Sequence, residues 1–81
     1  MKIRVLAFAR LRELLDGPER SLELPDGARV RDAWEALVRM QPALEDERAS
    51  TRAARNGALV QFDEALAGGD ELALLPPVGG G

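Results

Sequence analysis

The sequence predicts an α+β fold in which one main helix covers one face of a mixed sheet. Two short segments of alternating apolar residues, Lys2–Ala9 and Glu71–Leu75, are typical of strands and lie near the two ends of the chain. Between them, Val30–Met40 repeats its apolar residues at helical spacing. The chain has 81 residues, which suffices for one modest core, so these elements are expected to pack together in one domain.

The first third of the chain is expected to contain two strands joined by a short helical turn. In Lys2–Ala9, Ile3, Val5 and Ala7 share one face. Leucines at helical spacing predict a helical turn over Arg10–Leu15, and the Asp-Gly-Pro sequence that follows should stop it. Ser21–Leu24 is expected to be the second strand, because it alternates and then meets the turn sequence Pro-Asp-Gly.

The best-marked helix is Val30–Met40. Its apolar stripe is Val30, Ala33, Trp34, Leu37 and Val38. Pro42 disfavours helical backbone in the residue before it, so the helix should end near Met40. Trp34 lies inside the stripe and is expected to fill the core rather than to serve as a ligand platform. The charged segment 45–48 is expected to be a solvated loop or a short helix.

A hairpin and a final strand are expected in the second half. Asn56-Gly57 separates the strand-like segments 52–55 and 58–62, and Asn-Gly favours the tight turn of a two-residue hairpin. Gly68-Gly69 then turns the chain into Glu71–Leu75, and no helical pattern follows it that would make a phosphate-binding loop. The order of elements is that of the β-grasp, or ubiquitin-like, fold, in which the first and last strands lie side by side in the centre.

Composition excludes several classes of function. The formal net charge is −3 and basic residues do not cluster, which argues against nucleic-acid binding. The chain has no cysteine and no histidine, so disulfides, thiol nucleophiles and the usual zinc sites are excluded and no metal is expected. The acidic pairs Asp63-Glu64 and Asp70-Glu71 lie in turn sequences, where solvated acids are expected rather than a catalytic dyad or a magnesium site.

The N-terminal apolar run is interrupted by Arg4 and is too short for a signal sequence or a membrane span. We therefore expect a soluble cytoplasmic protein without a membrane partner.

The C-terminal sequence Leu-Leu-Pro-Pro-Val-Gly-Gly-Gly suggests a division into a β-grasp domain, residues 1–75, and an extended tail, residues 76–81. Pro76 and Pro77 restrict φ, whereas the glycines that follow lack a Cβ. A conformationally restricted segment should therefore lead into a protruding end without side chains. The alternative interpretation is an ordinary frayed terminus.

Several segments resemble the family of molybdopterin synthase small subunits, which are ubiquitin-like sulfur carriers. The matching segments are "FARLRELL" (Phe8–Leu15), "LPDGARVRDAWEAL" (Leu24–Leu37), "ARNGALVQFDEALAGGDELALLPPV" (Ala54–Val78) and the terminal Gly80-Gly81. Together they span nearly the whole chain. Leu74 and Leu75 depart from the family, which often has aromatic residues at these two positions.

The resemblance implies a mechanism that uses the C-terminus. In this family an adenylating enzyme of the ubiquitin-activating type uses ATP to activate the terminal glycine carboxylate, here that of Gly81, which becomes a thiocarboxylate. The carrier pairs with a large subunit in a heterotetramer, where the sulfur passes to a cyclic pterin precursor. The carrier has no permanently bound cofactor and is not an enzyme on its own. Gly80 and Gly81 would enter a narrow tunnel, which suits residues without side chains.

Strand alternation predicts a partner-binding surface beside the tail. If Ile3, Val5, Leu72 and Leu74 face the helix, then the residues that face away from it are Leu6, Phe8, Ala73 and Leu75. Leu59 should join them, and we expect a bulge or bend in its strand to turn it outward. This apolar surface and the tail residues Pro76, Pro77, Val78 and Gly79 are the predicted partner contacts.

Three interpretations stay open from the sequence. The first is the molybdopterin sulfur carrier. The second is a related carrier for thiamine thiazole or tRNA thiolation, or a protein modifier that uses the same Gly-Gly chemistry. The third is a plain β-grasp interaction module whose tail only frays.

Overall fold

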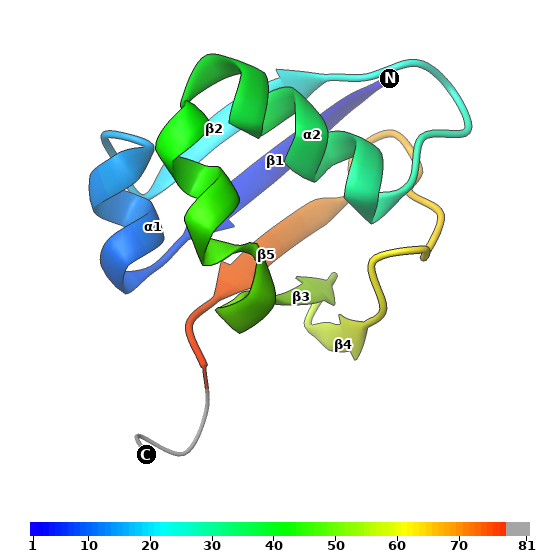
Figure 1. The fold of residues 1–81 in the computed structure, drawn as a ribbon. Coiled ribbons are helices and arrows are strands. Elements are labelled where there is room, and N and C mark those ends of the chain that lie inside the picture. Colours follow the sequence, from blue (N-terminus) through cyan, green and yellow to red (C-terminus); the bar gives the residue numbers. More distant parts are fainter. Residues whose placement is uncertain (78–81) are drawn as a thin grey trace.

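Five strands form one mixed sheet in the order β2-β1-β5-β3-β4 (Figure 1). The computed structural model describes residues 1–77, and Val78–Gly81 lie outside the described residues. The strands are β1 (Lys2–Ala7), β2 (Glu19–Glu23), β3 (Arg52–Arg55), β4 (Ala58–Val60) and β5 (Glu71–Leu75), and the helices are α1 (Ala9–Leu14), α2 (Val30–Met40) and the 3₁₀ helix η1 (Pro42–Ser50).

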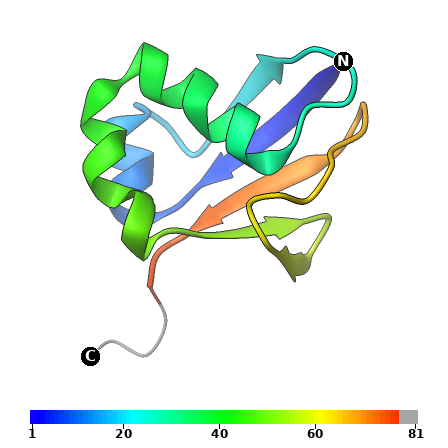
Figure 2. The same cartoon turned by 45° about the vertical axis from the view of Figure 1, so that its right-hand side comes forward.

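The first and last strands are parallel neighbours in the middle of the sheet. Arg4 lies opposite Glu71 and Ala7 opposite Leu74. β2 pairs with β1 and β3 pairs with β5, both antiparallel. The predicted β-grasp arrangement of the sheet and helix is therefore confirmed. Because β1 and β5 run in the same direction, their carboxyl ends share one edge of the sheet (Figure 2).

α2 crosses one face of the sheet and covers the core (Figures 1 and 2). It spans Val30–Met40, as its periodicity and Pro42 predicted. Its inward side chains, Val30, Ala33, Trp34 and Leu37, are buried against the inward residues of the sheet: Ile3, Val5, Leu72 and Leu74. Trp34 is a core residue, as predicted. η1 contains the segment 45–48, which was expected to be a loop or a short helix, and it adds the fully buried Leu44 just before that segment.

The β3–β4 hairpin turns at Asn56-Gly57, where both residues have positive φ, +50° and +88°. This is the backbone that a type I′ turn requires. The register is continuous, with Ala54 opposite Leu59 and Ala53 opposite Val60. The expected bulge at Leu59 was therefore wrong: simple alternation along β4 turns this residue outward while Val60 packs against the core.

β4 ends at Val60, two residues before the predicted end of this strand. The segment that follows turns back to meet α2. Phe62 and Glu64 use their carbonyl oxygens to accept the N–H groups of Arg31 (2.8 Å) and Val30 (2.9 Å). Since N–H groups in the first turn of a helix have no partner within the helix, this segment satisfies two of them.

Candidate functional site

The predicted partner-binding residues that belong to strands, Leu6, Leu59 and Leu75, lie on the face of the sheet that α2 leaves uncovered. The inward residues of β1 and β5 are at most 3% exposed. On the opposite face, Leu6 and Leu75 are partly exposed, Phe8 is 43% exposed and Leu59 is 65% exposed. The structure thus separates a core face from an apolar outward face, as strand alternation predicted.

Register brings four small or apolar outward residues into one row across the sheet. Leu6 lies opposite Ala73, Ala73 opposite Ala54, and Ala54 opposite Leu59. We call these four residues the outer row. Ala54 was missing from the predicted surface. The hairpin register around Asn56-Gly57 could have placed it, because a two-residue turn puts Ala54 opposite Leu59.

The outward face is apolar only toward the carboxyl ends of β1 and β5. Nearer the start of β1, the Arg4 side chain crosses to its neighbouring strands and pairs with Glu71 (2.6 Å) and Glu19 (3.3 Å). The hydrogen bond to Glu71 and the charge of Glu19 raise the pKa of Arg4. These carboxylates neutralise the guanidinium, so the apolar part of the face has a polar boundary on this side.

Phe8 is held by the start of α1. Its backbone is extended, and its carbonyl oxygen accepts the N–H groups of Leu11 (3.1 Å) and Arg12 (3.4 Å). The next residue, Ala9, has a φ of +51°, a conformation that is uncommon for residues other than glycine. The chain therefore turns sharply after Phe8, which directly follows the pair of Ala7 with Leu74 near the end of β5.

Pro76 and Pro77 leave the sheet directly after β5 and are exposed (Figure 1). Leu75, the last residue of β5, still pairs with Arg52. The root of the tail is therefore anchored to the sheet beside the outer row. The predicted reactive residues Gly80 and Gly81, and the predicted contacts Val78 and Gly79, lie outside the described residues.

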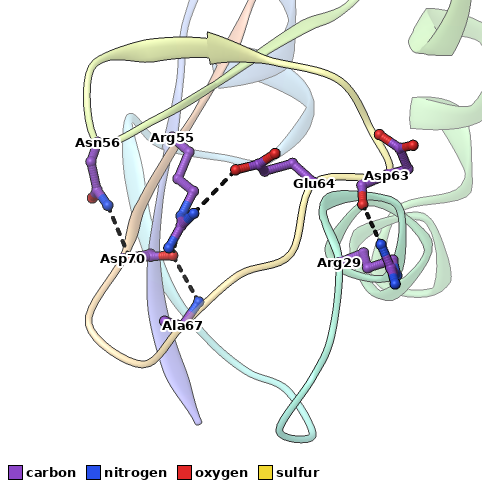
Figure 3. A network of polar contacts seen from close by, with 7 residues as sticks. All are labelled: Arg29, Arg55, Asn56, Asp63, Glu64, Ala67 and Asp70. Atoms are coloured by element: carbon purple, nitrogen blue, oxygen red, sulfur yellow. Dashed lines mark hydrogen bonds and ion pairs between the residues drawn. The ribbon is translucent and has the colours of Figure 1, made fainter.

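One acidic residue differs from its expected role. Asp70 is only 7% exposed, and its carboxylate accepts hydrogen bonds from Arg55 (2.7 Å), Asn56 (2.9 Å) and the N–H of Ala67 (2.8 Å) (Figure 3). Burial alone would raise the pKa of Asp70, but these hydrogen bonds outweigh it and lower the pKa below its ordinary value. The prediction of a solvated turn acid was wrong here, because the fold surrounds this carboxylate with donors.

The same network fixes the hairpin turn to the start of β5. Arg55 also pairs with Glu64 (3.1 Å) (Figure 3). Asn56 accepts the N–H of Glu71 on its side-chain oxygen (2.9 Å) and donates its own backbone N–H to the Glu71 carbonyl (2.8 Å). Because its donors and acceptors satisfy one another, the network reads as structural rather than catalytic.

Within residues 1–77, no three histidine, cysteine or acidic side chains gather closely enough to hold a metal ion. None of the helices in this part of the chain is long and apolar enough to cross a membrane.

Comparison with known proteins assigns the family. The model of the ThiS family matches residues 5–81. This chain belongs to the ThiS family.

Relatives of this ThiS-family chain match it over its whole length. It is 40% identical to a molybdopterin synthase sulfur carrier subunit of Chlamydomonas reinhardtii, with 100% of each chain covered. It is 43% identical to the protein of the same name from Escherichia coli, with 98% of this chain and 99% of the relative covered. The resemblance inferred from the sequence segments is therefore confirmed.

A solved structure shares the fold. Small archaeal modifier protein 1 from Haloferax volcanii matches with a TM-score of 0.86 and 35% identity, over 95% of this chain and 98% of that chain. Proteins with two different functional names, sulfur carrier subunits and a modifier protein, thus resemble this ThiS-family chain closely.

Proposed function

We propose that this chain is the sulfur carrier subunit of molybdopterin synthase. The observation that carries the proposal is full-length similarity, at 40% and 43% identity, to sulfur carrier subunits from an alga and a bacterium. The outward apolar face beside the root of the tail supports it, because a carrier must dock on the proteins that load and unload it.

The reactive group in this proposal is the terminal carboxylate of Gly81. A carboxylate is a poor electrophile, so an adenylating enzyme of the ubiquitin-activating type joins it to the α-phosphate of ATP and releases pyrophosphate. A sulfur nucleophile supplied by a donor then displaces AMP and leaves a thiocarboxylate. ATP is bound by the activating enzyme, and the carrier itself holds no permanent cofactor.

The loaded carrier then docks on the synthase large subunit in a heterotetramer. Its sulfur passes to the cyclic pterin precursor, and the terminal carboxylate is regenerated with oxygen from water. Each carrier delivers one sulfur atom, so two loaded carriers complete one dithiolene. In this scheme Gly80 and Gly81 enter the large subunit, and Leu6, Phe8, Leu59, Leu75 and residues 76–79 contact it.

Intact-mass analysis tests the loading step. The chain ending at Gly81 is incubated with ATP, an activating enzyme and a sulfur donor. We expect a mass increase equal to the replacement of one oxygen atom by sulfur. A variant with one alanine appended after Gly81 is the matched control and should gain no sulfur. Equal behaviour of the two chains, or no sulfur on the wild type, would contradict the carrier proposal.

A protein modifier is the second candidate, and the similarity to small archaeal modifier protein 1 is the observation that favours it. Carriers for thiamine thiazole or tRNA thiolation use the same loading chemistry. Reconstitution with the pterin precursor and the large subunit separates these alternatives. Conversion of the precursor supports the molybdopterin carrier, whereas isopeptide conjugates on lysines of other proteins without such conversion would support the modifier.

A further inference from the structure

A groove lies beside the root of the tail, between the end of η1 and the β3–β4 hairpin. Its volume is about 510 Å³, and its lining includes Arg48, Arg52, Leu59, Phe62 and Pro77. In Figure 2 the end of η1 lies next to the end of β5, which agrees with the pairing of Arg52 with Leu75. The groove is thus continuous with the surface where a partner would receive the tail.

The groove has a firm wall. The Phe62 ring packs against the core and meets the Trp34 ring edge to face, with centroids 6.0 Å apart. On the other side, the buried Thr51 donates its hydroxyl to the Glu47 carbonyl at 2.6 Å. A wall fixed in this way loses little conformational freedom when a partner binds.

Arg48 is oriented by this wall. Its guanidinium carbon lies 3.4 Å from the centroid of the Phe62 ring. Stacking of this kind uses the flat face of the guanidinium and leaves its N–H edge for a carboxylate in the same plane. Arg48 is therefore held ready for a charge-assisted, two-pronged hydrogen bond.

The two arginines of the groove have no acidic partner among the described residues. Within residues 1–77, the arginines that form ion pairs are Arg4, Arg10 and Arg55, and Arg48 and Arg52 are among those that form none. The chain as a whole has a net charge of −3. Two uncompensated positive charges in one groove of an acidic protein are complementary to a negatively charged partner.

We propose that this groove docks an acidic segment of the molybdopterin synthase large subunit. Carboxylates of that segment pair with Arg48 and Arg52, and a neighbouring apolar side chain packs on Leu59 and Phe62. This inference rests on the proposed function and extends it, because Arg48, Arg52 and Phe62 belong neither to the tail nor to the outer row. The groove shares only Leu59 with the outer row and Pro77 with the tail, so one partner can cover the adjoining surfaces together.

The test measures the affinity of the large subunit for the full chain by calorimetry at low and at moderate salt. We expect Arg48→Glu and Arg52→Glu each to weaken binding about tenfold and to reduce its salt dependence. Arg48→Lys keeps the charge but loses the planar fork, so it should fall between the wild type and Arg48→Glu.

Arg39→Glu is the matched control. Arg39 is exposed on α2 and lines a different depression, formed with residues 24–28. Its replacement changes the net charge by the same amount, so it reports the long-range effect of charge alone, for which we expect a change of about twofold or less. Thermal unfolding of each variant verifies that it is folded.

The outcomes separate the two proposals. If the wild type binds the large subunit and the groove variants bind as the Arg39→Glu variant does, the groove inference is overturned while the proposed function stands. If the wild type does not bind the large subunit, the proposed function is wrong. The proposal that the groove docks a segment of the large subunit is then wrong as well. Weakening at the groove but not at the control supports the inference.

Discussion

Among single residues, Asp70 connects its own turn to the β3–β4 hairpin, which lies 14 and 15 residues earlier in the sequence. Its carboxylate accepts from the hairpin residues Arg55 and Asn56 and from the backbone of Ala67. The ionised form receives these hydrogen bonds, so the fold stabilises the charge, and the pKa of Asp70 lies below its ordinary value in spite of burial. Asp70 thereby holds the entrance to β5, the strand that leads to the tail.

We expect Asp70→Asn to destabilise the domain by about 1–3 kcal/mol at neutral pH, because charge-assisted hydrogen bonds are lost and a donor is left facing Arg55. The wild-type carboxylate has a lowered pKa in the folded state, so its contribution is present above the unfolded-state pKa, which is about 3.9. It is lost as the pH falls through the folded-state pKa.

Urea unfolding of the wild type and Asp70→Asn at several pH values measures this effect. The stability difference should be full near neutrality and should shrink as the pH falls below about 4. Asp63→Asn is the control, since Asp63 is exposed and uses its backbone carbonyl, not its carboxylate, to accept from Arg29. A difference for Asp70 that does not change with pH would refute a role for the charge.

Among the elements, the β3–β4 hairpin depends on local backbone geometry. Asn56 and Gly57 both have positive φ, and an added Cβ at Gly57 would meet no atom within 4 Å. Any cost of a side chain at Gly57 therefore comes from the backbone and not from crowding. A substitution at Gly57 therefore measures the requirement for positive φ without a contribution from steric clashes.

We expect Gly57→Ala to destabilise the domain by about 1 kcal/mol, because alanine resists positive φ. Gly68→Ala is the matched control. Gly68 is also exposed, its φ lies outside the positive range, and an added Cβ would lie 3.6 Å from the Met1 Cβ, an ordinary van der Waals distance. Chemical unfolding of both variants compares them. Equal losses at the two positions would contradict the requirement for positive φ at Gly57.

For the whole molecule, the two faces of the sheet have different roles. One face packs against α2 and stabilises the fold, and the other is the proposed binding surface. Leu74 and Leu75 are neighbours on β5, yet Leu74 is fully buried against α2 and Leu75 is partly exposed on the outward face. The same division applies to Ala7 and Phe8 at the end of β1. Adjacent residues therefore allow the two roles to be tested separately.

Leu74→Ala should destabilise the domain by about 2–5 kcal/mol, because it removes buried methyl groups and leaves a cavity. A single modest core has little stability to spare, so this variant is expected to show a much lower unfolding midpoint in urea. A loss below about 1 kcal/mol would show that Leu74 is not part of the core.

Phe8→Asp and Leu75→Asp should leave the domain folded and weaken its binding to the large subunit by tenfold or more, because each places a charge in an apolar contact. Titration calorimetry measures the affinity, and thermal unfolding verifies the fold. Lys2→Asp, on the exposed polar end of β1, is the control. Normal affinity in both variants would refute the outward face as the docking surface.

The sequence by itself determined the elements whose signals are local. Each of these signals depends only on residues that are close together in the sequence. They are the helical spacing of Val30–Met40, the alternation of Glu71–Leu75 and the Asn-Gly turn. The structure has these features at the predicted positions. The sequence also predicted that Leu6 and Leu75 face outward, since alternation along a strand has a fixed period, although it missed Ala54.

The tertiary structure alone decided the partners of side chains that meet across long stretches of chain. Asp70 finds Arg55, fifteen residues away, and Arg48 stacks on Phe62 because η1 and the segment after β4 pack together. The end of β4 at Val60 has the same origin, since the following carbonyl oxygens accept N–H groups from α2. Such contacts depend on how the elements pack in space, and no local period in the sequence records that.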